Sequence, residues 1–101
     1  MATKNLVREV TPEVLRRAAE IIKLLGHPER LKIVEVLEGG EATVSQIQEK
    51  VGLPQAIVSQ HLAKLRGADV VEARREGVRV YYHLTEAKVH HILQCIRTCD
   101  M

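Results

Sequence analysis

Residues 44–66 read VSQIQEKVGLPQAIVSQHLAKLR, and this stretch decides the fold. Apolar residues recur at helical spacing on both sides of a break at Val51-Gly52-Leu53. The pattern predicts a short helix over about 44–50 and a second helix over about 54–66. Two helices joined by so short a break are typical of a helix-turn-helix, here over about 43–66.

Two more helices are predicted before this motif. The first begins at Thr11-Pro12-Glu13, where a capping hydroxyl, a proline and an acid suit a helix start, and it ends at Gly26. The second begins at His27-Pro28-Glu29 and ends at Gly39-Gly40. A very short turn therefore joins these two helices.

Downstream of the motif the apolar spacing changes from helical to alternating. Two β-rich runs, 70–75 and 78–84, flank Glu76-Gly77 and predict a hairpin, or wing, over about 70–84. Helical spacing then returns over about 85–99. The predicted fold is mainly α-helical with a small β-hairpin: a winged helix-turn-helix of about five helices and a two-stranded wing.

The composition limits what this fold can contain. With 101 residues we expect a single domain, 1–101, without room for a separate ligand-binding domain. Any signal must then be sensed within this fold or at a subunit interface. The net charge of +2 does not identify a partner by itself. No signal peptide or run of roughly 20 apolar residues is present, so we expect a cytoplasmic protein with no membrane partner.

The second helix of a helix-turn-helix enters the DNA major groove with its N-terminal residues at the base edges. Short polar side chains at these positions suit that role, since glutamine pairs with adenine and lysine meets the backbone. A plain solvated helix face would show similar residues, but the arginines of the wing favour DNA binding. The candidate DNA contacts are Gln55, Ala56, Ser59, Gln60, His61, Lys64, Arg74, Arg75 and Arg79.

Three motifs then resemble the ArsR/SmtB family of winged-helix repressors. They are the Gly-His-Pro-x-Arg turn at 26–30, the Val-Ser-x-His-Leu segment at 58–62, and the wing from Arg75 through Tyr82 with Gly77 inside it. The resemblance extends from about Ala18 to the last helix. It implies homodimers paired through the first and last helices, which bind palindromic double-stranded DNA operators and are released by an inducer.

Physical arguments also favour a dimer. Two copies about one duplex turn apart read both half-sites, which raises specificity over a single winged module. The last helix carries an apolar stripe that suits a partner, although the same stripe could cover the core of its own subunit. Its members are Val89, Ile92, Leu93 and Ile96.

Compared with this family, three familiar sensor sites are missing. Thr43-Val44-Ser45 stands where arsenite sensors carry Cys-Val-Cys. Glu86 and Lys88 stand where zinc sensors carry an acid and a histidine, and an ammonium group is no metal ligand. Glu35 occupies the position of the first cysteine of persulfide sensors.

A possible sensor remains in the last helix, where His91, Cys95 and Cys99 are spaced four residues apart. On a helix this spacing places all three on one face, with Cα atoms about 6 Å apart. They could ligate a thiophilic metal or a metalloid such as arsenite, or the thiols could be reversibly modified. Alternatively, Cys95 only packs in a dimer seam and Cys99 lies idle at a helix end.

The sequence therefore predicts a sequence-specific repressor released by a metal, metalloid or thiol-reactive inducer. One alternative is a DNA-binding regulator without cysteine-based sensing, and another is a winged helix that serves as a protein assembly module. An enzyme is not expected, because no phosphate-binding loop, nucleophile signature or pair of carboxylates in a plausible cleft is present.

Overall fold

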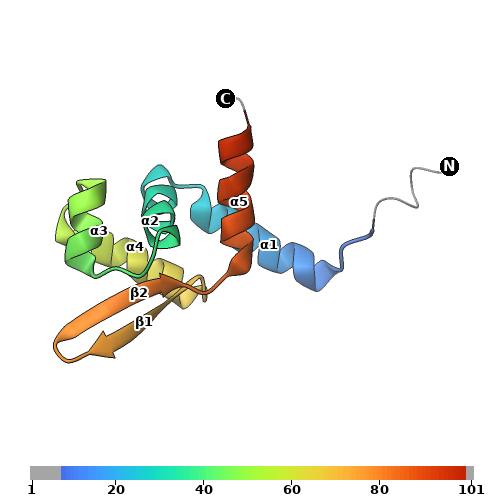
Figure 1. The fold of residues 1–101 in the computed structure, drawn as a ribbon. Helices are drawn as coiled ribbons and strands as arrows, with labels where there is room; N and C mark the ends of the chain where they lie inside the picture. The colour runs from blue at the N-terminus through green and yellow to red at the C-terminus, as the bar shows by residue number, and fades with distance from the viewer. Residues whose placement is uncertain (1–7, 100–101) are drawn as a thin grey trace.

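The computed structural model describes residues 8–99, and the predicted elements are present in the predicted order (Figure 1). This confirms the mainly α-helical winged helix-turn-helix fold. None of the described helices is long and apolar enough to cross a membrane. The elements are α1 (Pro12–Leu25), α2 (Pro28–Glu38), α3 (Val44–Val51), α4 (Gln55–Gly67), β1 (Val71–Glu76), β2 (Arg79–Leu84) and α5 (Ala87–Thr98).

The core lies between α2, α3, α4 and the base of the hairpin, with α1 and α5 at its edge (Figure 1). It is aliphatic, as the lack of Phe and Trp requires. Such side chains interdigitate closely, so the loss of a few methyl groups from one of them costs about 2–5 kcal/mol. The most deeply buried large side chains are Ile21, Ile33, Val34, Ile47, Val58, Leu62, Leu65, Val70, Val71 and Val89.

The helix-turn-helix is shaped by local interactions at the ends of α3. A capping box opens this helix: the Thr43 hydroxyl accepts from the Gln46 N–H at 3.2 Å, and the Gln46 side chain accepts from the Thr43 N–H at 2.9 Å. Gly52 closes it with φ of +73°, in the left-handed region that suits glycine. The chain then turns sharply into α4.

The wing is attached to the loop that precedes α3. Its strands pair antiparallel, with Glu76 opposite Arg79, so the turn is Gly77-Val78, one residue later than the sequence predicts. Ala42 adds an isolated β-bridge to Tyr82 through two backbone hydrogen bonds of 3.0 and 2.8 Å. This bridge holds the hairpin in a defined position beside the helix-turn-helix.

The last helix is attached to α2. Val89 and Leu93 are buried in the core, so this part of the apolar stripe covers the subunit's own interior. Near the end of α2, Glu38 accepts hydrogen bonds from Arg97 and, at 3.2 Å, from His90. The Arg97 guanidinium, and to a smaller extent His90, lower the pKa of Glu38.

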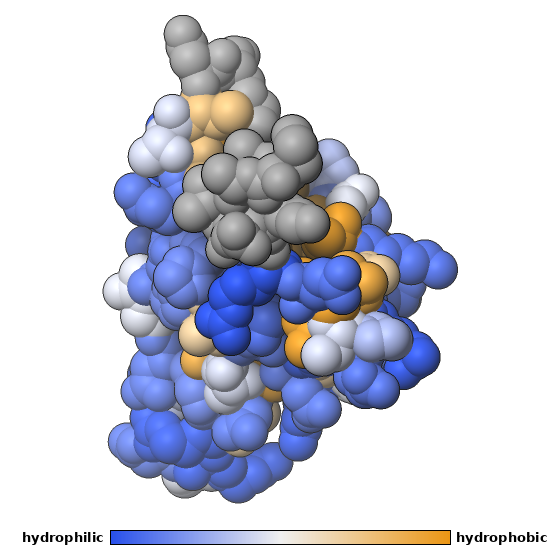
Figure 2. Space-filling model, turned by 90° about the vertical axis from the view of Figure 1, so that its right-hand side faces the viewer, coloured by the Kyte–Doolittle hydropathy of each residue, from blue (hydrophilic) through white to orange (hydrophobic). Residues whose placement is uncertain are grey.

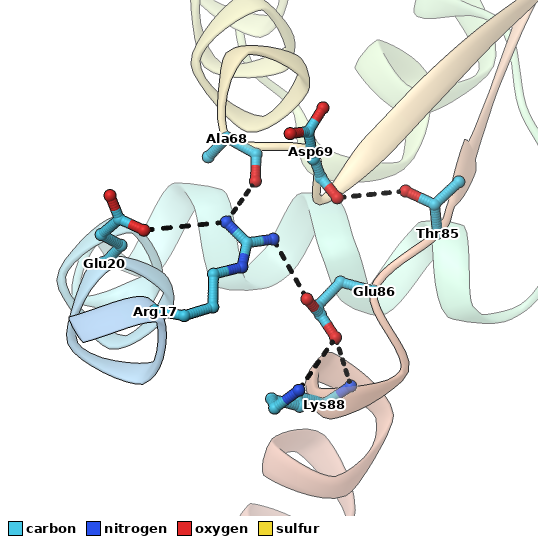
Figure 3. Close-up of polar contacts among 7 residues, drawn as sticks. All are labelled: Arg17, Glu20, Ala68, Asp69, Thr85, Glu86 and Lys88. Carbon is cyan, nitrogen blue, oxygen red and sulfur yellow. Dashed lines mark hydrogen bonds and ion pairs between the residues drawn. The ribbon is translucent and has the colours of Figure 1, made fainter. Parts of the chain in front are cut away.

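Arg17 joins α1 to two other elements (Figure 3). Its guanidinium donates to the Ala68 carbonyl at 2.7 Å and to the Glu86 carboxylate at 3.1 Å. Glu86 also caps α5 by accepting from the Lys88 N–H at 3.2 Å, so the helix starts two residues later than predicted. The Thr85 hydroxyl, just before this cap, donates to the Asp69 carbonyl at 3.2 Å.

Acid should weaken this junction. The Lys88 backbone N–H, and next the Arg17 side chain, lower the pKa of Glu86 in the folded protein. An unfolded carboxyl titrates near a pKa of about 4.3, so this stabilisation is complete above that pH. It is lost as the pH falls through the lower folded value. We expect Glu86→Gln to lower the melting temperature at pH 7 and to flatten its decline in acid.

Thermal unfolding followed by circular dichroism between pH 7 and pH 3 measures this effect. Glu49→Gln is the matched control, because Glu49 is exposed on α3 and forms no ion pair or side-chain hydrogen bond within residues 8–99. Identical melting curves for the parent protein and Glu86→Gln across this range would contradict the assigned role of Glu86.

Candidate nucleic-acid interface

The candidate contact residues of α4 lie on its exposed face. Residues 55, 56, 59, 60 and 64 are exposed, and this spacing places them along one side of the helix. Val58, Leu62 and Leu65 are buried on the opposite side. The face is made of short polar and small side chains at its start and a lysine further along, held on a helix that the core fixes in place.

His61 does not belong to this face. It is only 8% exposed, and its Nε2 lies 2.9 Å from the Glu29 carboxylate while its Nδ1 lies 3.4 Å from the Arg30 guanidinium. The side chain therefore packs α4 against α2 and, contrary to the prediction, does not lie on the exposed face with the other candidate contacts. The signal was present in the sequence, because position 61 shares the helical spacing of Val58 and Leu65.

The N terminus of α4 lacks a side-chain cap, since Pro54 occupies the capping position. The other helix of the motif, α3, has a complete capping box. Uncapped N–H groups and the positive end of the helix dipole are suited to a phosphate group. This is a feature of the backbone that side-chain patterns do not reveal.

The structure separates Arg74 from the other two wing arginines. Its guanidinium binds Glu41 at 2.6 Å and Glu76 at 2.6 Å, and it lies over the Tyr81 ring with 4.9 Å to the centroid. The hydrogen bonds that Arg74 donates to the carboxylates of Glu41, and next of Glu76, raise the pKa of Arg74. Two carboxylates thus balance its charge, and its contacts brace the wing against the loop before α3.

Arg75 and Arg79 are exposed, and neither forms an ion pair within the part of the chain that the structure describes. Arg75 pairs across the hairpin with Val80, and Arg79 pairs with Glu76, so the two guanidinium groups flank the tip on opposite faces. Their charge is available to an anionic surface. The hairpin extends away from the terminal helices (Figure 1).

Comparison with known proteins identifies the family. Residues 27–73, which span α2 to the start of the wing, match the family described as bacterial regulatory protein, arsR family. The chain is 34% identical over 94 residues to the biofilm growth-associated repressor of Xylella fastidiosa, covering 93% of this chain and 82% of that protein.

The chain belongs to the ArsR family. It is 43% identical over 79 residues to the transcriptional repressor PagR of Bacillus anthracis, covering 77% of this chain and 79% of PagR. The crystal structure of PagR matches with a TM-score of 0.77 at 39% identity, over 85% of this chain and 99% of that one.

The family confirms two predictions. This ArsR-family chain is a DNA-binding transcriptional repressor, and its relatives are regulators rather than enzymes. The resemblance that its three sequence motifs carry is also confirmed.

Among the residues that the structure describes, the ligand atoms of His91, Cys95 and Cys99 are not grouped as a three-ligand metal site. The helix ends at Thr98, and Cys99 follows it with extended backbone, at φ of −85° and ψ of 130°. Cys99 is the C-cap residue of α5, and its N–H donates to the Cys95 carbonyl at 3.0 Å, so its Cα keeps the four-residue helical spacing from Cys95; both thiols are exposed. Among residues 8–99, the group of three side chains placed to hold one metal ion is instead His27, Glu29 and His61.

An apolar surface remains exposed on the terminal helices of this repressor. Leu15 and Ile22 of α1 are 56% and 63% exposed, and Ile96 of α5 is 38% exposed. Figure 2, which views the side of the molecule that carries α1, shows hydrophobic side chains among the hydrophilic ones there. Side chains of this size are costly to leave in water, so the surface suits a partner.

Proposed function

We propose that this ArsR-family repressor reads a specific DNA operator by inserting the exposed face of α4 into the major groove. The observation that carries the proposal is the arrangement of Gln55, Ser59 and Gln60 on one solvent-facing side of a helix whose other side is buried. A glutamine can bond in bidentate fashion to adenine, and a serine can reach a base or a phosphate. These groups can therefore distinguish one base sequence from another.

The neighbouring groups fit the same placement of DNA. Ala56 offers a methyl contact to thymine, and Lys64 can reach the backbone. The uncapped N terminus of α4 suits a phosphate, and Arg75 and Arg79 of the wing suit phosphates further along the duplex. Contacts to phosphates orient the protein, while the contacts from α4 supply sequence specificity.

We further propose that two copies pair through α1 and α5 and bind a palindromic operator. The exposed apolar residues Leu15, Ile22 and Ile96 support this pairing, as does the placement of the wing away from the terminal helices (Figure 1). A twofold axis through this surface leaves both recognition helices free to reach successive major grooves.

Selection of bound duplexes from a random DNA pool, followed by titration at several salt concentrations, tests operator reading. We expect enrichment of an inverted repeat and a steep loss of affinity as salt rises, because phosphate contacts release counterions. If no sequence were enriched and the affinity did not depend on salt, the alternative function, a winged helix that binds other proteins, would be favoured.

The wing arginines should act on affinity for any DNA. Arg75→Gln and Arg79→Gln should each weaken binding to operator and random duplex alike, and reduce the salt slope by about one per lost phosphate contact. Arg16→Gln is the matched control, because it removes a cation that is also exposed but lies on α1 rather than on the wing. Fluorescence anisotropy at several salt concentrations measures the slopes, and slopes equal to that of the control would exclude the wing from the interface.

Release by an inducer at the C-terminal helix is a second proposal, supported by the exposure of both thiols and by the position of Cys95 next to Ile96 in the proposed dimer surface. An arsenite ion or a reversible modification there would alter the pairing of subunits. We expect Cys95→Ser with Cys99→Ser to retain operator binding and to lose release by arsenite, persulfide or peroxide. Release that persists in this double variant would indicate a regulator without cysteine-based sensing.

A further inference from the structure

Three potential metal ligands converge where the start of α2 meets α4. His27 is the N-cap residue of α2, Glu29 lies in its first turn, and His61 comes from the buried side of α4. One ligand atom from each lies within 4.8 Å of the others. The two imidazole rings meet edge to face with their centroids 4.8 Å apart.

We propose that His27, Glu29 and His61 bind a divalent transition metal that prefers imidazole, such as Zn²⁺, with water as the fourth ligand. Two histidines and one glutamate are a known zinc ligand set. Ligand atoms about 2.0–2.1 Å from a tetrahedral ion stand about 3.3 Å from each other. The Glu29 oxygen and His61 Nε2 are already 2.9 Å apart, so closing the site mainly requires rotation of His27, which gives up the 3.3 Å hydrogen bond that its Nδ1 accepts from the Glu29 N–H.

Burial and access are both suitable. His61 is held rigidly at 8% exposure, which places its Nε2 in advance and reduces the entropy lost on binding. His27 and Glu29 are only partly buried, so an ion can enter from solvent on their side. His61 is thus a fixed ligand, whereas the side chains of His27 and Glu29 can adjust to the ion.

The charges around the site select the kind of metal. Glu29 supplies one negative charge, while Arg30 and the positive end of α2 lie nearby. Hard cations such as Mg²⁺, which need several oxygen ligands, are disfavoured there. Zn²⁺, Ni²⁺ and Co²⁺ bind neutral imidazole strongly, so the two histidines of this site can still hold them despite the nearby positive charge.

Metal binding requires a change of tautomer at His61. In the metal-free arrangement the Nε2–H donates to Glu29, and Nδ1 accepts from the Arg30 guanidinium. Coordination through Nε2 moves the proton to Nδ1 by exchange with water, and the Arg30 Nη1 atom, 3.4 Å away, turns aside. Arg30 keeps its 2.7 Å hydrogen bond from Nε to the Leu24 carbonyl, so its side chain remains anchored.

The test uses protein with Cys95→Ser and Cys99→Ser, so that thiols cannot contribute. Zn²⁺ and Co²⁺ are titrated against a chromophoric chelator, without DNA, so the outcome does not depend on the proposed function. His27→Asn retains a good N-cap residue, and Glu29→Gln retains an oxygen for His61. His90→Gln with His91→Gln is the control that removes two exposed histidines from α5.

We expect one equivalent of metal to bind, and His27→Asn or Glu29→Gln to weaken binding by about tenfold or more. Metal should also raise the melting temperature of the parent and the control but not of these two variants, because it binds only the folded site. The proposal would be overturned if no metal bound, if all variants bound metal with equal affinity, or if the His90→Gln, His91→Gln control lost metal binding.

Discussion

Replacement of Leu15 and Ile22 by glutamate should convert the repressor to a monomer and weaken its binding to a palindromic operator by about 100-fold or more. Both side chains are more than half exposed on α1, so the subunit fold does not depend on their burial. In the proposed dimer they are covered, and pairing would bury four unpaired carboxylates. The cost of removing these charges from water exceeds the gain from the remaining apolar contacts.

Light scattering after gel filtration measures the mass, and anisotropy with full and half operators measures the affinity. Lys50→Glu serves as the control for oligomeric state, since it places a new carboxylate on the exposed surface of α3. We expect the control to keep the mass of the parent and the double variant to bind full and half operators equally. A double variant that remains dimeric would show that subunits pair elsewhere.

Gln60→Ala and Ser59→Ala should each reduce affinity for the operator while leaving affinity for random DNA nearly unchanged. A bidentate contact to a base contributes about 1–3 kcal/mol of discrimination, which corresponds to about 5- to 150-fold for Gln60→Ala. The smaller serine contact should give a smaller loss. Both residues are exposed on α4, so these substitutions leave the core intact.

Competition between labelled operator and random duplex separates the two affinities. Gln94→Ala is the matched control, because it removes an exposed glutamine from α5 rather than α4. We also expect Gln60→Ala to relax the base preference at one operator position when selection is repeated. If both α4 variants bound operator as tightly as the control does, α4 would not be the recognition helix.

Much of the architecture could be predicted because it depends on neighbours in the chain. Proline and capping residues begin α1 and α2, and Gly52 ends α3 in the left-handed conformation. The change in apolar spacing after α4 predicted the hairpin. The errors at β2 and α5 were shifts of one or two residues, which arose where a turn or a glutamate cap competed with the apolar pattern.

The roles of the polar residues in the candidate DNA interface were less predictable, because each role depends on contacts with residues distant in the chain. Arg74 and Arg75 are neighbours of the same type, yet Glu41 engages only Arg74. Similarly, His61 follows the exposed Gln60 but is buried against Glu29, 32 residues away. Neither partner can be identified from local spacing.

The sequence by itself determined the order of helices and wing, the helix that presents polar residues, and the family, since periodicity, caps and motifs are local properties. Only the tertiary structure decided which polar groups are free to meet DNA and which are engaged within the subunit. It paired Arg74 with Glu41, and it paired His61 with Glu29 and placed it beside His27. The physical reason is that burial and pairing depend on surfaces that meet only when the chain folds.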